Sequence, residues 1–405
     1  MRKLTFTTLF KVPETANLAR QHKTLTYLIH SMVITLLSLF LAHFVIYDLE
    51  NIATFISTEK NDFQMSDIYN RIADYRSVSH VSPYVTVVSV DQCSRQDILY
   101  VLQMIAEYDP RAIGVDIFFR TTSDDSLEVL NTLSHIPNLV LPCKLERTET
   151  GAYEHMKYSF VENYLDANYA YVNLNATSTK DMIRDFTPRQ ITSTGDTLLQ
   201  MATAMAQIAA PEPYQELCAR NNPIETIKYS SVDIPTISAD LLLHGDNYEY
   251  LSRYLTGRAI LLGDVDNIND MYATPINPFI PGVMIHAYAL HTIISGQYTR
   301  VTPEWINWLI AIVIGVGFIF ANMLIKDRWS HMGNLLMRFL QIILMFGIVY
   351  IGSCWYKANM QYIDFSLVVL MIGFSALAVD VYDGVWAIGR RSIQLINNYK
   401  NKKKK

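Results

Sequence analysis

Three long apolar runs stand out from the mixed hydrophobic and polar pattern of this chain. Thr24–Tyr47, Trp305–Ile325 and Phe339–Tyr356 contain no Asp, Glu, Lys or Arg. A helix that crosses a bilayer needs about 20 predominantly apolar residues. The pattern therefore predicts three transmembrane helices at 24–47, 305–325 and 339–356, and it excludes a soluble enzyme.

A fourth run, 363–389, is interrupted by Asp380 and Asp383, but its apolar pattern resumes after them. We therefore predict a fourth transmembrane helix that continues through both acids. The two acids are three residues apart and share one helix face. Because an ionised carboxylate facing lipid is costly, this face should point to the other spans or to the cytoplasmic rim.

Two interpretations of these acids stay open. In one, the helix end is simply solvated. In the other, the acids form a charge lock between helices or a docking point for a partner protein. The candidate partners in a lock are basic residues near the ends of the spans: Lys326, Arg328, Arg338, Arg390 and Arg391.

The segment 48–304 has the pattern of a folded domain. Val85–Val90 is a short β-branched run that predicts a buried strand. Ser94 and Asp97 then form a capping box, which predicts a helix ending before Pro110. Ala112–Phe119 predicts a second strand. Strand, helix and strand in this order form a βαβ unit, so the sequence predicts an α/β domain with a partly parallel sheet.

The remaining elements follow from the same patterns. Further strands are predicted at 138–145, 169–174, 186–192, 224–229 and 259–262, and further helices at 126–135, 197–208, 238–243 and 286–295.

Charge decides the expected orientation of the spans. The chain carries a net charge of −5, but its acids gather in 48–304 and its bases in the flanks. Because cytoplasmic segments are enriched in Lys and Arg, both termini should be cytoplasmic. The expected order outside the spans is a cytoplasmic N-terminus 1–23, an outer domain 48–304, a cytoplasmic loop 326–338, an outer loop 357–362 and a basic cytoplasmic tail 390–405.

This order predicts a multi-pass protein of a bacterial inner membrane with a large periplasmic domain. The first apolar run is longer than a signal-peptide core, so we expect an uncleaved anchor. An acidic outer domain repels phosphate backbones, which argues against nucleic acid as a partner.

The sequence offers little recognisable catalytic chemistry. It has no phosphate-binding loop, no H-E-x-x-H and no cysteine pair with zinc spacing. We therefore expect no enzyme activity, no cofactor and no metal. Several acids do follow predicted strands, among them Asp116 and Asp270, and His286 begins a predicted helix. Strand ends of parallel sheets favour ligand sites, whereas the alternative is that these acids cap helices and hold loops.

Three cysteines lie in the expected outer domain: Cys93, Cys143 and Cys218. An oxidising compartment permits a disulfide. Cys93 follows the first strand and Cys143 ends the third, so we favour this pair. The alternative is three small buried hydrophobic side chains.

The segment Gly257–Gly296 carries a recognisable motif. It contains G-x-x-x-x-x-G, then D-x-x-x-T-P and P-G-V-x-x-H-A, with Asp270, Thr274, Gly282 and His286 among the matching residues. This resembles the end of the second type of CHASE domain, the cyclase/histidine-kinase-associated sensory extracellular domain. Upstream, Ala112–Phe119 is similar to the strand G-x-D-x-x-F of that family, with Asp116 in the acid position.

Two further motifs extend the resemblance over about 80–300. Asp124–Leu127 is similar to the family's D-D-x-x-L element, and Tyr171–Asn173 with Arg184 resembles its G-x-x-N…R segment, although Ala170 replaces the glycine. One span, this domain and then three spans is also typical of the family.

The resemblance implies a sensor, here in a stand-alone form without the output domain that such proteins usually carry. We expect it to perceive a ligand or partner through Asp116, Asp270 and His286, and to signal through its helices to a separate protein. A homo-oligomer is compatible with this interpretation. The alternative is a structural or assembly subunit of an envelope complex that switches nothing.

Overall fold

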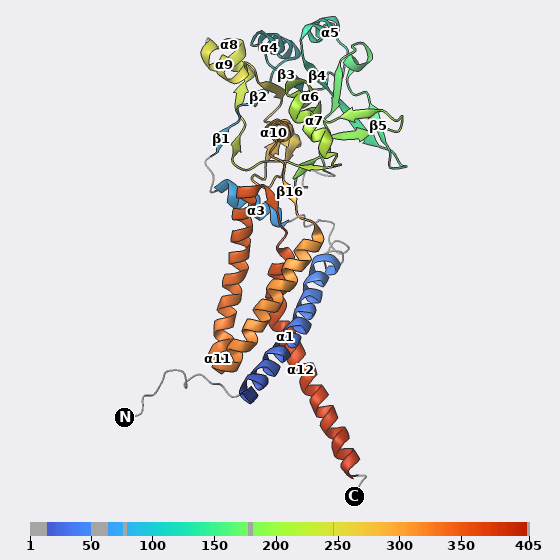
Figure 1. The fold of residues 1–405 in the computed structure, drawn as a ribbon. Coiled ribbons are helices and arrows are strands. Elements are labelled where there is room, and N and C mark those ends of the chain that lie inside the picture. The colour runs from blue at the N-terminus through green and yellow to red at the C-terminus, as the bar shows by residue number, and fades with distance from the viewer. Residues whose placement is uncertain (1–13, 50–63, 76–78, 177–180, 246, 403–405) are drawn as a thin grey trace, which may run out of the picture. The chain divides into compact units, whose positions relative to one another are not determined.

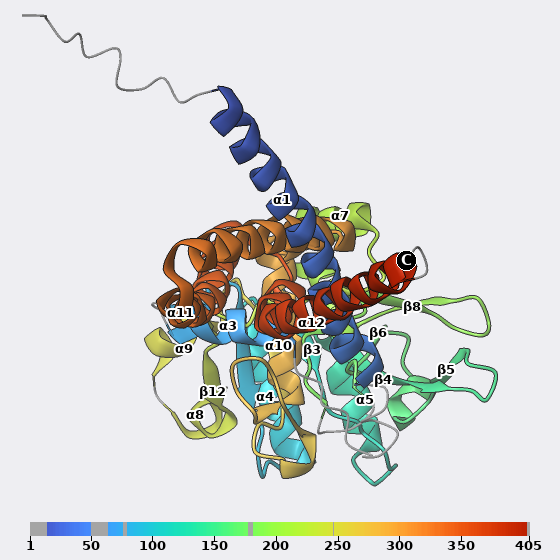
Figure 2. The same cartoon turned by 90° about the horizontal axis from the view of Figure 1, so that it is seen from below.

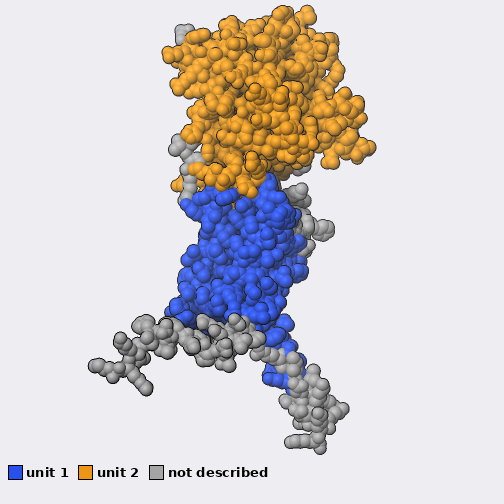
Figure 3. Space-filling view, in the orientation of Figure 1, with its two compact units in different colours: residues 1–61, 301–355, 362–405 blue, residues 62–300, 356–361 orange. Residues whose placement is uncertain are grey.

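The computed structural model describes residues 14–49, 64–75, 79–176, 181–245 and 247–402 (Figure 1). The chain divides into two compact units, coloured separately in Figure 3. Unit 1 contains the apolar helices. Unit 2 contains 62–300 together with the short segment Tyr356–Gln361. Residues 1–13, most of the expected cytoplasmic N-terminus, lie outside the described residues.

The described part of unit 1 is built from three long helical elements. They are α1 (Glu14–His43), continued by a π-helical turn η2 (Phe44–Leu49), α11 (Glu304–Asn359) and α12 (Ser366–Lys402). The ribbon of α11 reverses direction near its middle (Figure 1). These elements contain four stretches that are long and apolar enough to cross a membrane: Lys23–Ile46, Glu304–Trp329, Leu335–Asn359 and Ser366–Gly389. The predicted number of four such helices is confirmed.

The structure differs from the sequence pattern between the second and third spans. The helical assignment of α11 runs through 326–338, where we expected a loop. The expectation of a loop rested on the basic residues of this stretch. These residues mark the end of an apolar span, but they do not break a helix. The stretch contains Gly333 and no proline, so the helix can continue.

Small residues let the helices of unit 1 approach closely. A Cβ added to Gly315 in α11 would lie 2.7 Å from Cγ2 of Thr35 in α1 and 2.8 Å from Sδ of Met371 in α12. The His30 ring also lies 5.4 Å from the Tyr382 ring. Figures 1 and 2 both show α1 beside α12. Close backbone packing of this kind replaces the hydrophobic driving force that is absent between helices in lipid.

Unit 2 is an α/β domain around one twisted sheet. The order of hydrogen-bonded strands is β12-β2-β13-β3-β4-β5, with β6 also paired to β4. All pairs are parallel except β4–β5. The partly parallel sheet predicted from the βαβ pattern is therefore confirmed. The strands are β2 (Val85–Ser89), β3 (Ala112–Val115), β4 (Leu139–Arg147), β5 (Tyr153–Met156), β6 (Asn168–Tyr171), β12 (Thr236–Ser238) and β13 (Ala259–Gly263).

Helices cover both faces of this sheet. Successive side chains of a strand point to opposite faces, so Ala259 and Leu261 of β13 join one core cluster and Ile260 and Leu262 join the other. The first cluster includes α6 (Met201–Ala209), α7 (Pro211–Arg220) and α10 (Gly282–Ser295), and the second includes α4 (Arg95–Glu107), α5 (Ser126–His135), α8 (Ala239–His244) and α9 (Tyr248–Leu255).

Shorter elements complete the chain. They are α3 (Met65–Tyr75), β1 (His80–Val81), η3 (Phe160–Asn163), β7 (Asp185–Phe186), β8 (Arg189–Ile191), β9 (Thr197–Leu199), β10 (Glu225–Thr226), β11 (Val232–Asp233), η4 (Ile268–Asp270), β14 (Met271–Tyr272), β15 (Ile280–Pro281), β16 (Arg300–Val301) and β17 (Gln361–Tyr362).

Local signals predicted some elements better than others. The capping box of α4 is confirmed, since Ser94 and Asp97 exchange both capping hydrogen bonds. The helix expected from Thr197 is wrong at its start: 197–199 form strand β9, and α6 begins at Met201 after Gln200 accepts a capping bond from Ala202. The strand expected at 186–192 is interrupted by Pro188, which cannot donate to a ladder.

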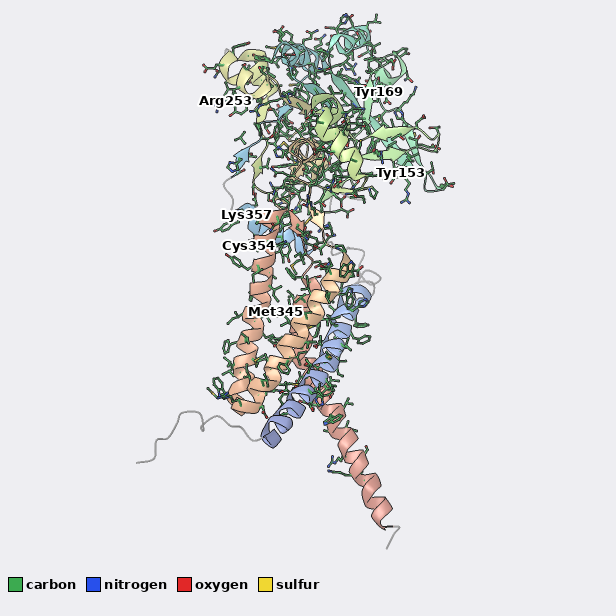
Figure 4. All side chains as sticks on the ribbon, viewed as in Figure 1. Tyr153, Tyr169, Arg253, Met345, Cys354 and Lys357 are labelled. Carbon is green, nitrogen blue, oxygen red and sulfur yellow. The ribbon has the colours of Figure 1, made fainter. Side chains whose placement is uncertain are left out.

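The expected disulfide between Cys93 and Cys143 is absent, because both thiols are free. Cys93 follows β2, while Cys143 lies inside β4 rather than at its end. Strands β13 and β3 lie between β2 and β4. Three strand spacings amount to about 14 Å, well beyond the roughly 7 Å that a disulfide can span. Cys143 is instead buried in a small cluster against which Tyr153 and Tyr169 pack; Figure 4 labels these two tyrosines.

Candidate functional site

A cavity of about 620 Å³ opens in unit 2, in the region of the carboxyl ends of β13, β3, β4 and β6. Asp116, Asp270 and His286, which sequence reasoning singled out from three separate segments, all line it. Asp116 follows β3, Asp270 ends the short helix η4 after β13, and His286 lies in the first turns of α10. This is the edge at which ligands bind in open parallel sheets.

Asp116 is a carboxyl group that the surrounding side chains do not stabilise in its charged form. Its backbone N–H donates to the carbonyl of Leu262 on the neighbouring strand, which fixes the residue at the cavity wall. Its carboxyl group has no hydrogen-bond or ion-pair partner in the part of the chain that the structure describes. Burial raises the pKa of Asp116 to about 7. Near neutral pH this carboxyl group is therefore poised between its two protonation states.

Asp270, unlike Asp116, has hydrogen-bond donors for its carboxyl group. Burial raises its pKa, and the nearby charge of Asp116 raises it further, whereas hydrogen bonds from Tyr272 and from the backbone of Gly282 lower it. A Cβ added to Gly282 would lie 2.5 Å from Oδ2 of Asp270. Glycine at the start of α10 thus allows the carboxyl group to approach the helix backbone, which explains why P-G-V follows the acid in this motif.

His286 supports the cavity wall as a neutral side chain. It is 1% exposed, and its Nδ1 lies 2.6 Å from Nε2 of Gln200. Burial lowers its pKa to about 4, against raising contributions from Asp270 and from a hydrogen bond to the backbone of Val172. The hydrogen bond between Gln200 and Nδ1 fixes the orientation of the His286 ring.

A second pair of acids lies beside the cavity. Asp264, which follows β13, also lines it. The neighbouring carboxyl group of Asp91 is the largest cause of the raised pKa of Asp264. Asp91 in turn accepts hydrogen bonds from the backbone of Val265 and Asp266, at 2.8 Å and 3.0 Å. Asp91 therefore holds the loop after β13, as the structural interpretation of these acids expected.

Sequence reasoning missed the basic side of the cavity. Arg120 and Lys144 line it, and Nζ of Lys144 lies 5.0 Å from the ring centre of Tyr158. Lys144 lies on β4, in a run that the sequence marked only as a strand. The alternation of β4 directs Lys144 away from its buried neighbours Cys143 and Leu145, and this was the one signal in the sequence.

Asn173 links two strands at the same edge. Its side-chain amide accepts from the backbone N–H of Leu145 and donates to the carbonyl of the same residue, both at 2.8 Å. Both hydrogen bonds are made to the end of β4, directly after Lys144. The asparagine of the G-x-x-N motif is therefore a structural clamp that fixes the cavity edge.

Other motif residues form ion pairs away from the cavity. Asp125 of the D-D-x-x-L element lies 2.9 Å from Nη1 of Arg95 at the start of α4. Arg184 binds Asp67 of α3 through two hydrogen bonds of 2.8 Å, and both side chains are at most 10% exposed. These two pairs tie loops and α3 to the domain.

The structure gives no metal centre to this site: within the described residues, no group of three or more His, Cys, Asp and Glu side chains could hold a metal ion. The cavity therefore offers separate acidic and basic groups, a tyrosine hydroxyl and side-chain amides. These are the groups with which proteins bind charged and polar small molecules.

The acids of the fourth span lie in unit 1. Helix α12 runs through Asp380 and Asp383, as the pattern predicted. Both side chains are exposed, and neither forms an ion pair with any side chain that the structure describes. Asp380 lines a small cavity of about 110 Å³ together with Lys326 and Arg338. Among the described residues of this unit, Lys23 forms an ion pair with Asp327, at 2.5 Å.

Comparison with known proteins gives one result. The family model described as "CHASE2 domain" matches residues 52–320, more than half of the chain and every residue that lines the larger cavity. No curated protein and no solved structure matches the chain.

Proposed function

Because the chain belongs to the CHASE2 domain family, a family of extracellular sensor domains, we propose that it is an integral membrane sensor or regulatory subunit. Its outer domain perceives a ligand or partner and signals through the four helices to a separate cytoplasmic protein. A ligand can do this only by binding two states of the domain with different affinity.

The observation that carries this proposal is the membership of Tyr356–Gln361 in unit 2. This segment contains the last turn of α11, at the end of the candidate span Leu335–Asn359, and the first residues of the link to the span Ser366–Gly389. The end of a span that folds as part of the sensory domain must follow any rearrangement of that domain. A span end without contacts to the domain would not transmit such a movement.

Specific contacts within unit 2 hold this segment. Tyr356 is 1% exposed, and its hydroxyl lies 3.2 Å from Oδ1 of Asn70 and 3.4 Å from the hydroxyl of Thr299. The carbonyl of Met360 accepts a hydrogen bond of 2.8 Å from the backbone of Arg300. Contacts from α3, from the end of the domain and from this segment therefore meet in one place.

We place the protein in a bacterial inner membrane, with the sensory domain in the periplasm and both termini in the cytoplasm. The basic flanks and the acidic outer segment support this placement. An extracellular sensor family supports the same side for the domain.

A distance measurement on the full chain in nanodiscs tests the sensor. Spin labels at Trp329→Cys and Leu395→Cys, in a background with the four native cysteines replaced by serine, report on unit 1. We expect Asp116→Asn in the cavity to change the distance distribution, and Tyr356→Ala to abolish that change. A structural or assembly subunit would give the same distribution in all three proteins, and this result would overturn the sensor.

A further inference from the structure

We propose that the large cavity of unit 2 binds a small zwitterion, whose ammonium group lies against Asp116 and Asp270 and whose carboxylate or phosphate lies against Arg120 and Lys144. This inference rests on the proposed function only in taking the cavity as the ligand site of the sensor.

The acidic end of the cavity is one connected group. Asp116 and Asp270 are close enough for each charge to act on Tyr272, and Tyr272 also shares a hydrogen bond with Asp270. Asp116 has no partner of its own among the described side chains. An incoming ammonium group would supply the missing positive charge and would stabilise the ionised form of this carboxyl group.

The basic end is organised around a different side chain, Tyr158. Lys144 lies over its ring, Phe118 packs against it with 5.9 Å between ring centres, and the charge of Arg120 acts on its hydroxyl. That hydroxyl donates a hydrogen bond to Glu146, which does not line the cavity. Arg120 and Lys144 form no ion pair with any described side chain.

The two ends are separated by the sheet itself. The acids follow β3 and β13, whereas Lys144 lies on β4, which is one strand from β3 and two strands from β13. Strand spacing puts the two ends about 5–10 Å apart. An extended dipeptide spans about 7 Å between its charged ends, and a volume of about 620 Å³ is in the range that holds small-molecule ligands.

The same chemistry has two sources, a short peptide and the headgroup of an aminophospholipid. The experiment uses the full chain in phosphatidylglycerol nanodiscs, which offer no zwitterionic lipid. One arm adds an equimolar pool of dipeptides made from Gly, Ala, Val and Ser. The other arm adds glycerophosphoethanolamine. Saturation-transfer NMR identifies the bound compounds, and calorimetry gives their affinities.

We expect at least one of these probes to bind in the cavity. For a bound dipeptide, N-acetylation or C-amidation should each weaken binding at least tenfold, because each removes one of the two charges. Asp116→Asn should abolish the discrimination against the N-acetylated form, and Lys144→Met the discrimination against the amidated form. For glycerophosphoethanolamine, each variant should weaken binding at least tenfold, with glycerol phosphate as the matched compound that lacks the ammonium group.

Two results would overturn the inference. One is that neither probe binds to the native chain, and the other is that blocked and free dipeptides bind equally well. If Lys144→Met lowers the yield of folded protein, Arg120→Gln on the exposed side of the cavity serves in its place. Binding without any change in the spin-label distances would refute the sensor and leave the ligand class intact.

Discussion

The hydroxyl of Tyr356 lies 3.2 Å from Oδ1 of Asn70, and both residues are buried. Tyr356 precedes the loop between two candidate spans, whereas Asn70 lies on α3 at the other end of unit 2 in sequence. The hydrogen bond therefore joins the first helix of unit 2 to the segment Tyr356–Gln361, which precedes the last candidate span.

Tyr356→Phe removes this bond and leaves Oδ1 of the buried Asn70 without the tyrosine donor. We expect it to lower the free energy of unfolding of the outer domain by about 1–2 kcal/mol, measured by urea titration of the full chain in nanodiscs. Tyr100→Phe on the exposed face of α4 is the matched control. In a double-mutant cycle with Asn70→Ala, a coupling energy near zero would contradict the role of this bond.

Lys228 should be a destabilising residue at neutral pH. Its side chain is buried, Nζ lies 3.2 Å from Sδ of Met360, and it has no ion pair among the described residues. Burial lowers the pKa of Lys228, and the charge of Lys357 (Figure 4) lowers it further. An unpaired buried ammonium group is costly, so Lys228→Met should raise the free energy of unfolding by about 1 kcal/mol.

The sign of the pH dependence follows from this lowered pKa. A lysine whose folded pKa lies below its unfolded value of 10.5 destabilises the fold increasingly as the pH falls below 10.5. The gain from Lys228→Met should therefore be larger at pH 7 than at pH 10 and should vanish above about pH 10.5. The exposed Lys157→Met is the control, and a gain that does not change with pH would refute the explanation.

Asp116→Asn should stabilise the domain with a pH profile of opposite direction. The pKa of Asp116 is raised from 3.8 to about 7, so the folded state binds one more proton than the unfolded state between these values. The free energy of unfolding of the native chain therefore falls as the pH rises from about 4 to 7. Asp116→Asn lacks the titrating group and does not show this loss. Because the side chain is partly exposed to the cavity, we expect a gain of about 1–2 kcal/mol at pH 7.5.

The measurement is thermal or urea unfolding of the native and variant chains at pH 4, 5.5, 7 and 8.5. The difference in the free energy of unfolding between the variant and the native chain should grow from pH 4 to pH 7 and stay constant above pH 7. Asn131→Ala, at an exposed position on α5, changes no titratable group and serves as the control. A variant that is less stable than the native chain at pH 7.5 would mean that the carboxylate makes a bond essential to folding.

The ion pair between Asp67 and Arg184 should be a strong structural contact. Its two bonds are 2.8 Å long, and its side chains are 7% and 10% exposed. Asp67→Asn removes a carboxylate charge from beside a buried guanidinium group, so it should lower the free energy of unfolding by about 3–5 kcal/mol. Removing both charges, with Asp67→Asn and Arg184→Met, should recover part of the loss. A loss below about 1 kcal/mol in the single variant would contradict this assignment.

The membrane topology is testable with alkaline phosphatase fusions, which are active only outside the cytoplasm. Fusions after Tyr214 and Asn359 should be active, and fusions after Trp329 and Asn397 inactive, because basic residues gather on one side of the spans. Activity after Asn397 would show that 363–389 does not cross the membrane, since α12 would then end on the outer side.

The sequence by itself determined the features that depend on local order. Runs without charge, such as Thr24–Tyr47, predict membrane helices because desolvating a charge is costly at any position in a span. The capping box at Ser94 and Asp97 determined the start of α4, because its bonds join residues three apart. Motif spacing singled out Asp116, Asp270 and His286, which the structure brings to one cavity.

Only the tertiary structure decided which distant segments meet. Strand β13 inserts between β2 and β3, so the two strands of the predicted βαβ unit are not neighbours, and Cys93 cannot reach Cys143. Lys144 became part of the cavity because β4 lies next to β3, and Tyr356 joined the domain because Asn70 of α3 is its partner. Such contacts depend on packing free energy summed over the whole domain, which no short window of sequence contains.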